Sequence, residues 1–119
     1  LKAGLKCSDI DQHVNAVYEE AGINWRTARS FGTGHSLGIM TYWFGREEGP
    51  ELRQFNDNVL QENMVVTMEP MINVDGLGGF RHHDICRITK DGIENLNTFP
   101  NGVLLVDDQN NIQEIWKPE

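Results

Sequence analysis

Apolar residues near the start of the chain recur at helical spacing: Ile10, Val14, Val17, Tyr18 and Ala21. Ser8 with Asp11 three positions later predicts a capping box, in which the serine side chain caps the first turn. Gly22 supplies the residue that commonly ends a helix. We therefore expect one amphipathic helix over residues 9–21, whose apolar face packs on a larger body.

After Gly22 the pattern changes to strands and turns. The segments rich in β-branched and apolar residues are 64–73, 80–89, 93–99, 103–106 and 112–116. Lys90-Asp91-Gly92 is a hairpin signal, and residues 107–111 predict the turn of a last hairpin. The expected fold class is α+β, with one or two helices packed on an antiparallel sheet.

Length and charge limit the classes of protein and partner. The 119 residues suffice for one domain, and a formal net charge of −8 disfavours binding to a nucleic-acid backbone. No apolar run approaches the ~20 residues of a membrane span, and no signal peptide precedes the first helix. Because the first residue is Leu1 rather than Met, we expect the chain to be a fragment of a longer protein.

The two cysteines, Cys7 and Cys86, do not have the spacing of a metal site. They favour a reducing, cytoplasmic setting in which both thiols behave as small apolar residues. A disulfide between them is the alternative.

Strand alternation places a carboxylate on an apolar face. In the segment 64–73, Glu69 shares a face with Val65, Thr67 and Met71. A carboxylate in such surroundings needs a partner or a pocket. The other interpretation is a glutamate at a strand end that faces water.

A polar stripe follows on the next strand. Arg81 and His83 share a face with Ile85, while His82 and Asp84 lie on the opposite face. The pair Arg81 and His83 could line a cleft, or could belong to a solvated face of the sheet.

His35 lies in a glycine-rich segment, between Gly34 and Gly38. Glycines permit close backbone approach, which loops around ligands often need, although a structural turn would use the same residues. Arg46 could clamp a substrate carboxylate or belong to a surface ion-pair cluster. Tyr42 begins an aromatic run that could wall a pocket or join the core.

These motifs together resemble the pita-bread hydrolase family, which includes methionine aminopeptidase, aminopeptidase P, prolidase and creatinase. Three ordered segments carry the resemblance: Gly34-His35-Ser36-Leu37-Gly38, Met64 to Glu69-Pro70, and Gly78-Gly79-Phe80-Arg81-His82-His83-Asp84. The resemblance spans about residues 1–100. It implies that residues 1–119 are the C-terminal part of a catalytic domain, that is, half of a pita-bread fold.

The resemblance also sets an expectation about metal. The family's metallopeptidases hold two divalent metals with two aspartates, one histidine and two glutamates. His35 and Glu69 match a histidine and a glutamate position, whereas His83 stands at the last glutamate position and the aspartates would lie upstream. Imidazole in place of a bridging carboxylate removes a negative charge, which disfavours two close divalent cations. We expect no metal cofactor; the alternative is manganese or cobalt on His35, Glu69 and His83.

Among the family's branches, creatinase is the most similar, because it carries an R-E-H-D segment and a stretch like residues 45–53. Creatinase hydrolyses creatine to sarcosine and urea without metal. The resemblance implies that Glu69 binds the guanidinium and Arg46 the carboxylate, and that His35 and His83 line the pocket. Arg81 and Tyr42 are also expected to bind substrate.

The expected activity is therefore creatinase-like hydrolysis of a small molecule. The alternatives are a metal-dependent Xaa-Pro dipeptidase or aminopeptidase, and a lyase or non-catalytic binding member of the same fold. We expect the fragment alone to be inactive and the full-length protein to be a cytoplasmic homodimer.

Overall fold

A computed structural model describes residues 1–38, 49–99 and 101–117. Two helices precede the strands: α1 (Cys7–Glu20) and α2 (Trp25–Ala28). The strands are β1 (Gly34–His35), β2 (Glu51–Leu52), β3 (Val65–Met68), β4 (Met71–Val74), β5 (Gly78–Arg81), β6 (Asp84–Ile88), β7 (Ile93–Asn95), β8 (Val103–Val106) and β9 (Ile112–Trp116). Every strand pairing among the described residues is antiparallel, as the α+β prediction requires.

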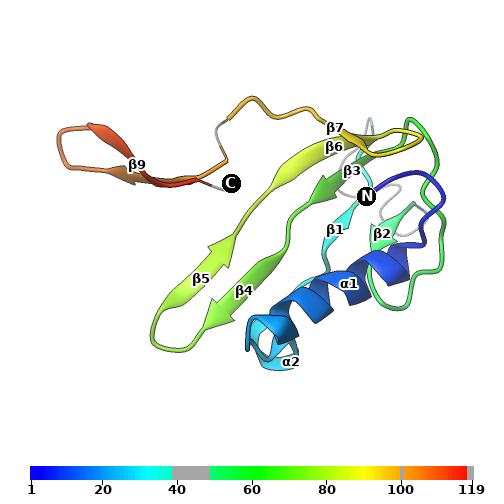
Figure 1. The fold of residues 1–119 in the computed structure, drawn as a ribbon, viewed down its shortest axis with the longest axis horizontal. Coiled ribbons are helices and arrows are strands. Elements are labelled where there is room, and N and C mark those ends of the chain that lie inside the picture. The colour runs from blue at the N-terminus through cyan, green and yellow to red at the C-terminus, as the bar shows by residue number, and fades with distance from the viewer. Residues whose placement is uncertain (39–48, 100, 118–119) are drawn as a thin grey trace.

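A long two-stranded ribbon dominates the structure (Figure 1). β3 pairs with β6 and β4 pairs with β5, and the register is the same on both sides of a break at residues 69–70 and 82–83. The prediction of two continuous strands, 64–73 and 80–89, was therefore wrong, because each is divided into two. The physical reason lies in Pro70, which has no N–H, and in Glu69, whose N–H donates to the carbonyl of Thr33 at 2.7 Å.

Helix α1 and strands β1 and β2 pack beside β3 and β6 of this ribbon (Figure 1). β1 pairs with β2 and also runs along β3, where the N–H of Leu37 donates to the carbonyl of Val65 at 2.9 Å. The core lies between these elements and consists of Cys7, Ile10, Leu52, Leu60, Val66, Cys86 and Ile88. Both cysteines are buried and free, as expected.

The start of helix α1 differs from the prediction. Ser8 is not its cap: the Ser8 Oγ donates to the Asp57 carboxylate at 2.8 Å. The first backbone N–H groups, of Cys7 and Ser8, instead donate to the carbonyls of Asn58 and Asn56, each at 2.9 Å. A loop distant in sequence thus satisfies donors that a serine side chain was expected to satisfy.

The predicted turns are present. Gly22 adopts φ +75° after the helix, and Thr89 and Gly92 close the turn between β6 and β7 with a 3.0 Å backbone hydrogen bond. β7 ends at Asn95, short of the predicted 93–99. In the described part of the chain, no helix is both long and apolar enough to cross a bilayer.

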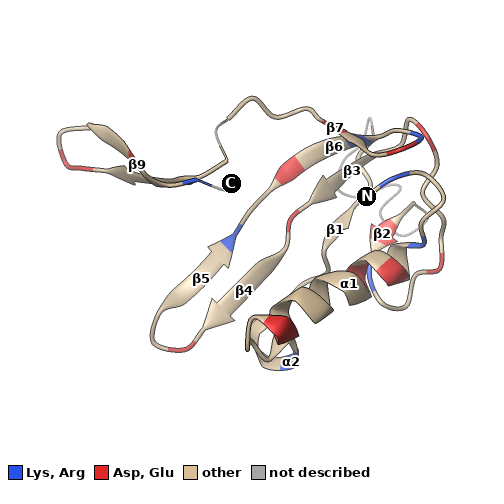
Figure 2. Cartoon of the chain, viewed as in Figure 1, with Lys and Arg blue, Asp and Glu red and all other residues tan. Residues whose placement is uncertain are grey.

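The last hairpin, β8 and β9, has the predicted bounds and projects away from the rest (Figure 1). Its strands carry few charged residues, whereas acidic and basic residues are interspersed over the helices, loops and ribbon (Figure 2). Although these two strands carry few charges, most of their residues are exposed to solvent.

Candidate functional site

The break in the ribbon holds the predicted pair of His35 and Glu69. β1 runs beside β3, so the His35 Nε2 lies 3.0 Å from the Glu69 Oε1. The two side chains are only 14% and 8% exposed, respectively. Of the two interpretations of Glu69, the structure therefore favours the carboxylate that is buried and paired over the one that faces water.

The two nitrogens of His35 both face oxygen atoms. Nδ1 lies 2.9 Å from the carbonyl oxygen of Ser36, which can only accept, so Nδ1 carries a proton. Nε2 faces a carboxylate oxygen, and a hydrogen bond there needs a further proton on one of the two atoms. The pair of His35 and Glu69 can thus hold and transfer a proton at Nε2.

Thr67 joins the two site residues, and the sequence reasoning gave it no role. Its Oγ1 accepts the backbone N–H of His35 at 3.0 Å and donates to the Glu69 Oε1 at 3.0 Å. The strand alternation that placed Thr67 on the face of Glu69 was the signal that could have identified it.

Arg81 reaches Glu69 from the other strand of the ribbon. Its guanidinium forms a hydrogen-bonded ion pair with the Glu69 Oε2. Both carboxylate oxygens of Glu69 are therefore bound to side chains, Oε1 to His35 and Thr67 and Oε2 to Arg81.

His83 does not join this cluster. It is exposed, and it forms no hydrogen bond or ion pair with another residue in the described part of the chain. The shared register sets it opposite Glu69 across the break, while its neighbour His82 pairs with Asp84 at 2.9 Å. The structure thus brings together two of the three predicted residues and adds Arg81.

The remaining predicted residues, Tyr42 and Arg46, lie outside the described residues. Glu51 and Arg53, which the sequence reasoning left without a role, line the same small hollow as His35, Glu69 and Arg81. The β1–β2 register places Glu51 opposite His35, and its Oε1 binds the Arg53 Nε at 2.8 Å.

Gly34 is needed for close approach, as predicted. A Cβ at this position would lie 2.0 Å from the carbonyl oxygen of Thr67, a distance that no side chain could adopt. Gly38 has no such neighbour, since a Cβ there would meet nothing within 4 Å. Only the first glycine of the motif therefore allows β1 to reach β3.

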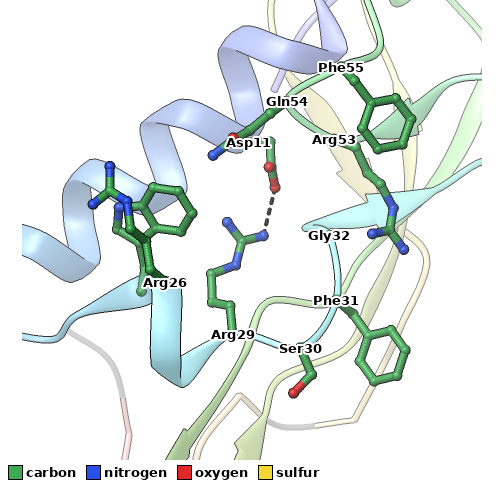
Figure 3. A pocket seen from close by; sticks show the side chains of 10 residues that line it. Asp11, Arg26, Arg29, Ser30, Phe31, Gly32, Arg53, Gln54 and Phe55 are labelled. Carbon is green, nitrogen blue, oxygen red and sulfur yellow. Dashed lines mark hydrogen bonds and ion pairs between the residues drawn. The ribbon is translucent and has the colours of Figure 1, made fainter.

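A buried polar cluster connects helix α1 to the site, and Figure 3 shows its Asp11–Arg29 pair. The Asp11 Oδ1 accepts from the Arg29 guanidinium at 2.6 Å and from the Thr33 Oγ1 at 2.6 Å. The carbonyl of Thr33 in turn holds the N–H of Glu69. The apolar face predicted for the helix is in fact partly polar, because Asp11 and Asn15 are buried against this arginine.

Next to this cluster lies a pocket of about 230 Å³ between helix α2 and the segment 53–55 (Figure 3). Aromatic and basic side chains line it, including Trp25, Phe31 and Arg26. It shares Phe31, Gly32 and Arg53 with the hollow at the candidate site, so the two lie side by side.

The donor set near Glu69 can be compared with what a divalent metal requires. Within residues 1–38, 49–99 and 101–117, no three His, Cys, Asp or Glu side chains form a group that could hold a metal ion. One imidazole and one carboxylate converge, and a guanidinium binds the second oxygen of that carboxylate. Catalytic metal sites commonly use about three protein ligands, so these residues alone do not fit one.

Comparisons with known proteins agree on one family. The sequence pattern of metallopeptidase family M24 matches residues 1–90. Creatinase from Bacillus sp. (strain B-0618) is 43% identical over 106 residues, which cover 86% of this chain and 25% of that protein. Xaa-Pro dipeptidase from Pyrococcus furiosus is 33% identical over 95 residues, covering 80% of this chain and 25% of that protein.

Solved structures show the same fold. Xaa-Pro dipeptidase from Bacillus anthracis superposes with a TM-score of 0.73 at 31% identity, covering 84% of this chain and 26% of that chain. X-Pro aminopeptidase from Thermotoga maritima gives a TM-score of 0.72 at 29% identity, covering 83% and 26%. The chain thus spans about a quarter of the length of these relatives.

Proposed function

This chain belongs to metallopeptidase family M24, and the relatives it resembles, creatinase and Xaa-Pro dipeptidase, are hydrolases. We propose that the full-length protein hydrolyses a small guanidino compound, as creatinase does. The identity to creatinase, 43%, exceeds the 33% to Xaa-Pro dipeptidase from Pyrococcus furiosus. His83, in place of a second carboxylate, supports the same choice.

The observation that carries the proposal is the guanidinium already bound to Glu69. A buried carboxylate that accepts the N–H donors of Arg81 has the geometry to accept those of a substrate guanidino group. In this proposal Arg46 binds the substrate carboxylate, and Tyr42 and His83 border the substrate. His35 orients Glu69 and holds a proton at Nε2.

The alternative is a metal-dependent Xaa-Pro dipeptidase or aminopeptidase using manganese or cobalt. Its support comes from the structural likeness to the Xaa-Pro dipeptidase of Bacillus anthracis. His35 and Glu69 would then need further ligands from upstream residues. A lyase, or a binding protein without catalytic activity, is the third alternative.

The test compares substrates on the full-length enzyme. We expect release of urea from creatine, unchanged by a chelator, and a loss of roughly 10²–10³ in kcat/KM for Glu69→Gln. Glu62→Gln is the matched control, because Glu62 is exposed on the loop before β3. Turnover of Xaa-Pro dipeptides alone, abolished by the chelator, would support the peptidase instead, and no turnover of either substrate would favour the third alternative. The homodimer and the cytoplasmic location stay predictions.

A further inference from the structure

We propose that Arg81 is a specificity-determining residue: it is an internal cation that competes with the cationic group of the ligand for Glu69. The inference rests on the proposed function in one respect, that the ligand's cation binds Glu69. It differs from the sequence-based expectation that Arg81 itself binds the substrate. The two roles predict opposite effects when Arg81 is replaced.

The argument begins with the partners of Glu69. Oε1 is bound by the His35 Nε2 and the Thr67 Oγ1, each at 3.0 Å, and Oε2 is bound by Arg81. Because the carboxylate is buried among these partners, we expect an incoming cation to displace one of them. Unless another cation replaces Arg81, its departure would leave the buried Oε2 without a donor and without the charge that balanced it, which is unfavourable.

Exposure identifies the partner that can leave. Thr67 is 1% exposed and its hydroxyl also holds the backbone of His35, so it is fixed. The ring of His35 is fixed by the Ser36 carbonyl. The Arg81 side chain is 45% exposed, at the last residue of β5, directly before the break in the ribbon. Arg81 is therefore the exchangeable partner.

A second binding environment is available to the Arg81 side chain. Arg81 also borders a larger pocket of about 700 Å³, lined by residues of the ribbon, of helix α1 and of the base of hairpin β8–β9. The lining there includes Phe80, Trp116 and Tyr18, and aromatic faces attract a guanidinium. A displaced Arg81 could thus move from the Glu69 carboxylate to an aromatic pocket, while a ligand cation takes its position.

This exchange selects the ligand by charge and shape. A planar monocation with several N–H donors replaces Arg81 without changing the net charge around Glu69. A neutral group of the same shape can bind Oε2 but does not replace the positive charge of the displaced Arg81. The ligand class is therefore a guanidinium or amidinium compound, which binds more weakly than it would if Arg81 were absent.

The experiment measures the binding of methylguanidinium to the full-length protein by calorimetry. Arg81→Met keeps the length of the side chain and removes its charge, and we expect the Kd to fall at least tenfold. Arg81→Lys should give a smaller change, because an ammonium still competes. Neutral methylurea should bind no better to the variant than to the wild type.

The matched control is Arg87→Met, since Arg87 lies on the same ribbon, is 41% exposed and is paired with Glu94 at 2.7 Å. Its Kd for methylguanidinium should equal that of the wild type. Adding Glu69→Gln to Arg81→Met should remove the gain. Circular dichroism checks the fold of Arg81→Met, and Arg81→Gln is the second variant if it does not fold.

A Kd that is unchanged or raised in Arg81→Met overturns the competition, and so does absence of binding in both wild type and variant. Creatine turnover is measured separately, so the proposed function can stand when the competition fails. Conversely, tighter methylguanidinium binding without creatine turnover would keep the competition and reject creatine as substrate.

Discussion

The helix–ribbon body, formed by α1, α2 and β1 to β7, and the C-terminal hairpin, β8 and β9, both contain antiparallel strand pairs. Only the body buries, fully or in part, most of the apolar side chains of its strands. Val66, Cys86 and Ile88 of the ribbon are almost fully inaccessible to solvent. In the hairpin, apolar residues such as Leu105 and Trp116 remain more than half exposed. Backbone pairing is thus present in both regions, while most of the hydrophobic contribution to stability comes from the body.

The family match follows the same division, because it covers residues 1–90 and ends before the hairpin. The described residues of the site lie in the body, where residues far apart in sequence hold one another: His35 binds Thr67, and Asp11 binds Thr33. The comparison teaches that the geometry of the site depends on long-range contacts. Substitutions in the body should therefore have much larger effects than equivalent ones in the hairpin.

The largest effect is expected from Asp11→Ala. The Asp11 Oδ1 lies 2.6 Å from the Arg29 Nη2, and both side chains are 6% exposed, so the change leaves a buried guanidinium without its carboxylate. The free energy of unfolding should fall by about 3–5 kcal/mol, measured by urea denaturation. Asp108→Ala, in the exposed turn of the hairpin, should change it by less than about 0.5 kcal/mol. Equal losses in the two variants would remove the distinction between the regions.

A smaller loss is expected from Gly34→Ala. The added Cβ would collide with the Thr67 carbonyl and separate β1 from β3, at a cost of about 2–3 kcal/mol in the same denaturation assay. Gly38→Ala adds a Cβ that meets no neighbour and should be neutral within about 0.5 kcal/mol. If Gly34→Ala proved as mild as this control, β1 would not be held closely against β3.

The smallest effect on stability should come from the buried thiols. Burial raises the pKa of Cys7 and of Cys86, the latter also through the charge of Asp84. Above the unfolded pKa of about 8.5, thiolates form first in the unfolded chain, so the free energy of unfolding, measured by urea denaturation at several pH values, should decrease as pH rises toward the folded pKa values.

Alkylation by iodoacetamide, followed by mass spectrometry, compares the accessibility of individual thiols in the body and in the hairpin. In Leu105→Cys the new hairpin thiol should react roughly a thousandfold faster than Cys7 and Cys86 under native conditions. Comparable rates for all three would mean that the body opens as readily as the hairpin.

Local features of the fold could be predicted from the sequence because they depend on neighbouring residues. The hairpin strands 103–106 and 112–116 and the turn at Gly92 were predicted correctly, since alternation and turn residues suffice for them. The cap of helix α1 was wrong because the loop at residues 56–58, not Ser8, satisfies its first donors. The ribbon break was missed because the N–H of Glu69 is taken by Thr33, 36 positions earlier.

The site, like the fold, was predictable from the sequence only in part. The motifs located His35 and Glu69, and the structure joins them. Arg81 was expected to bind substrate, but its pairing with Glu69 depends on the register across the ribbon, which the sequence does not specify. The role of Thr67 and the buried cluster around Asp11 likewise depend on how β1 and helix α1 pack.

The identical register on both sides of the ribbon break has an evolutionary consequence. Because the strands resume in phase, an exposed residue at the break can be replaced without shifting any pair in the ribbon. His83 in particular is exposed and makes no hydrogen bond or ion pair with the rest of the described chain, so mutation there leaves the scaffold intact. Selection can therefore try a new side chain at this position one codon at a time, and descendants of one ancestral scaffold can diverge here while keeping their architecture.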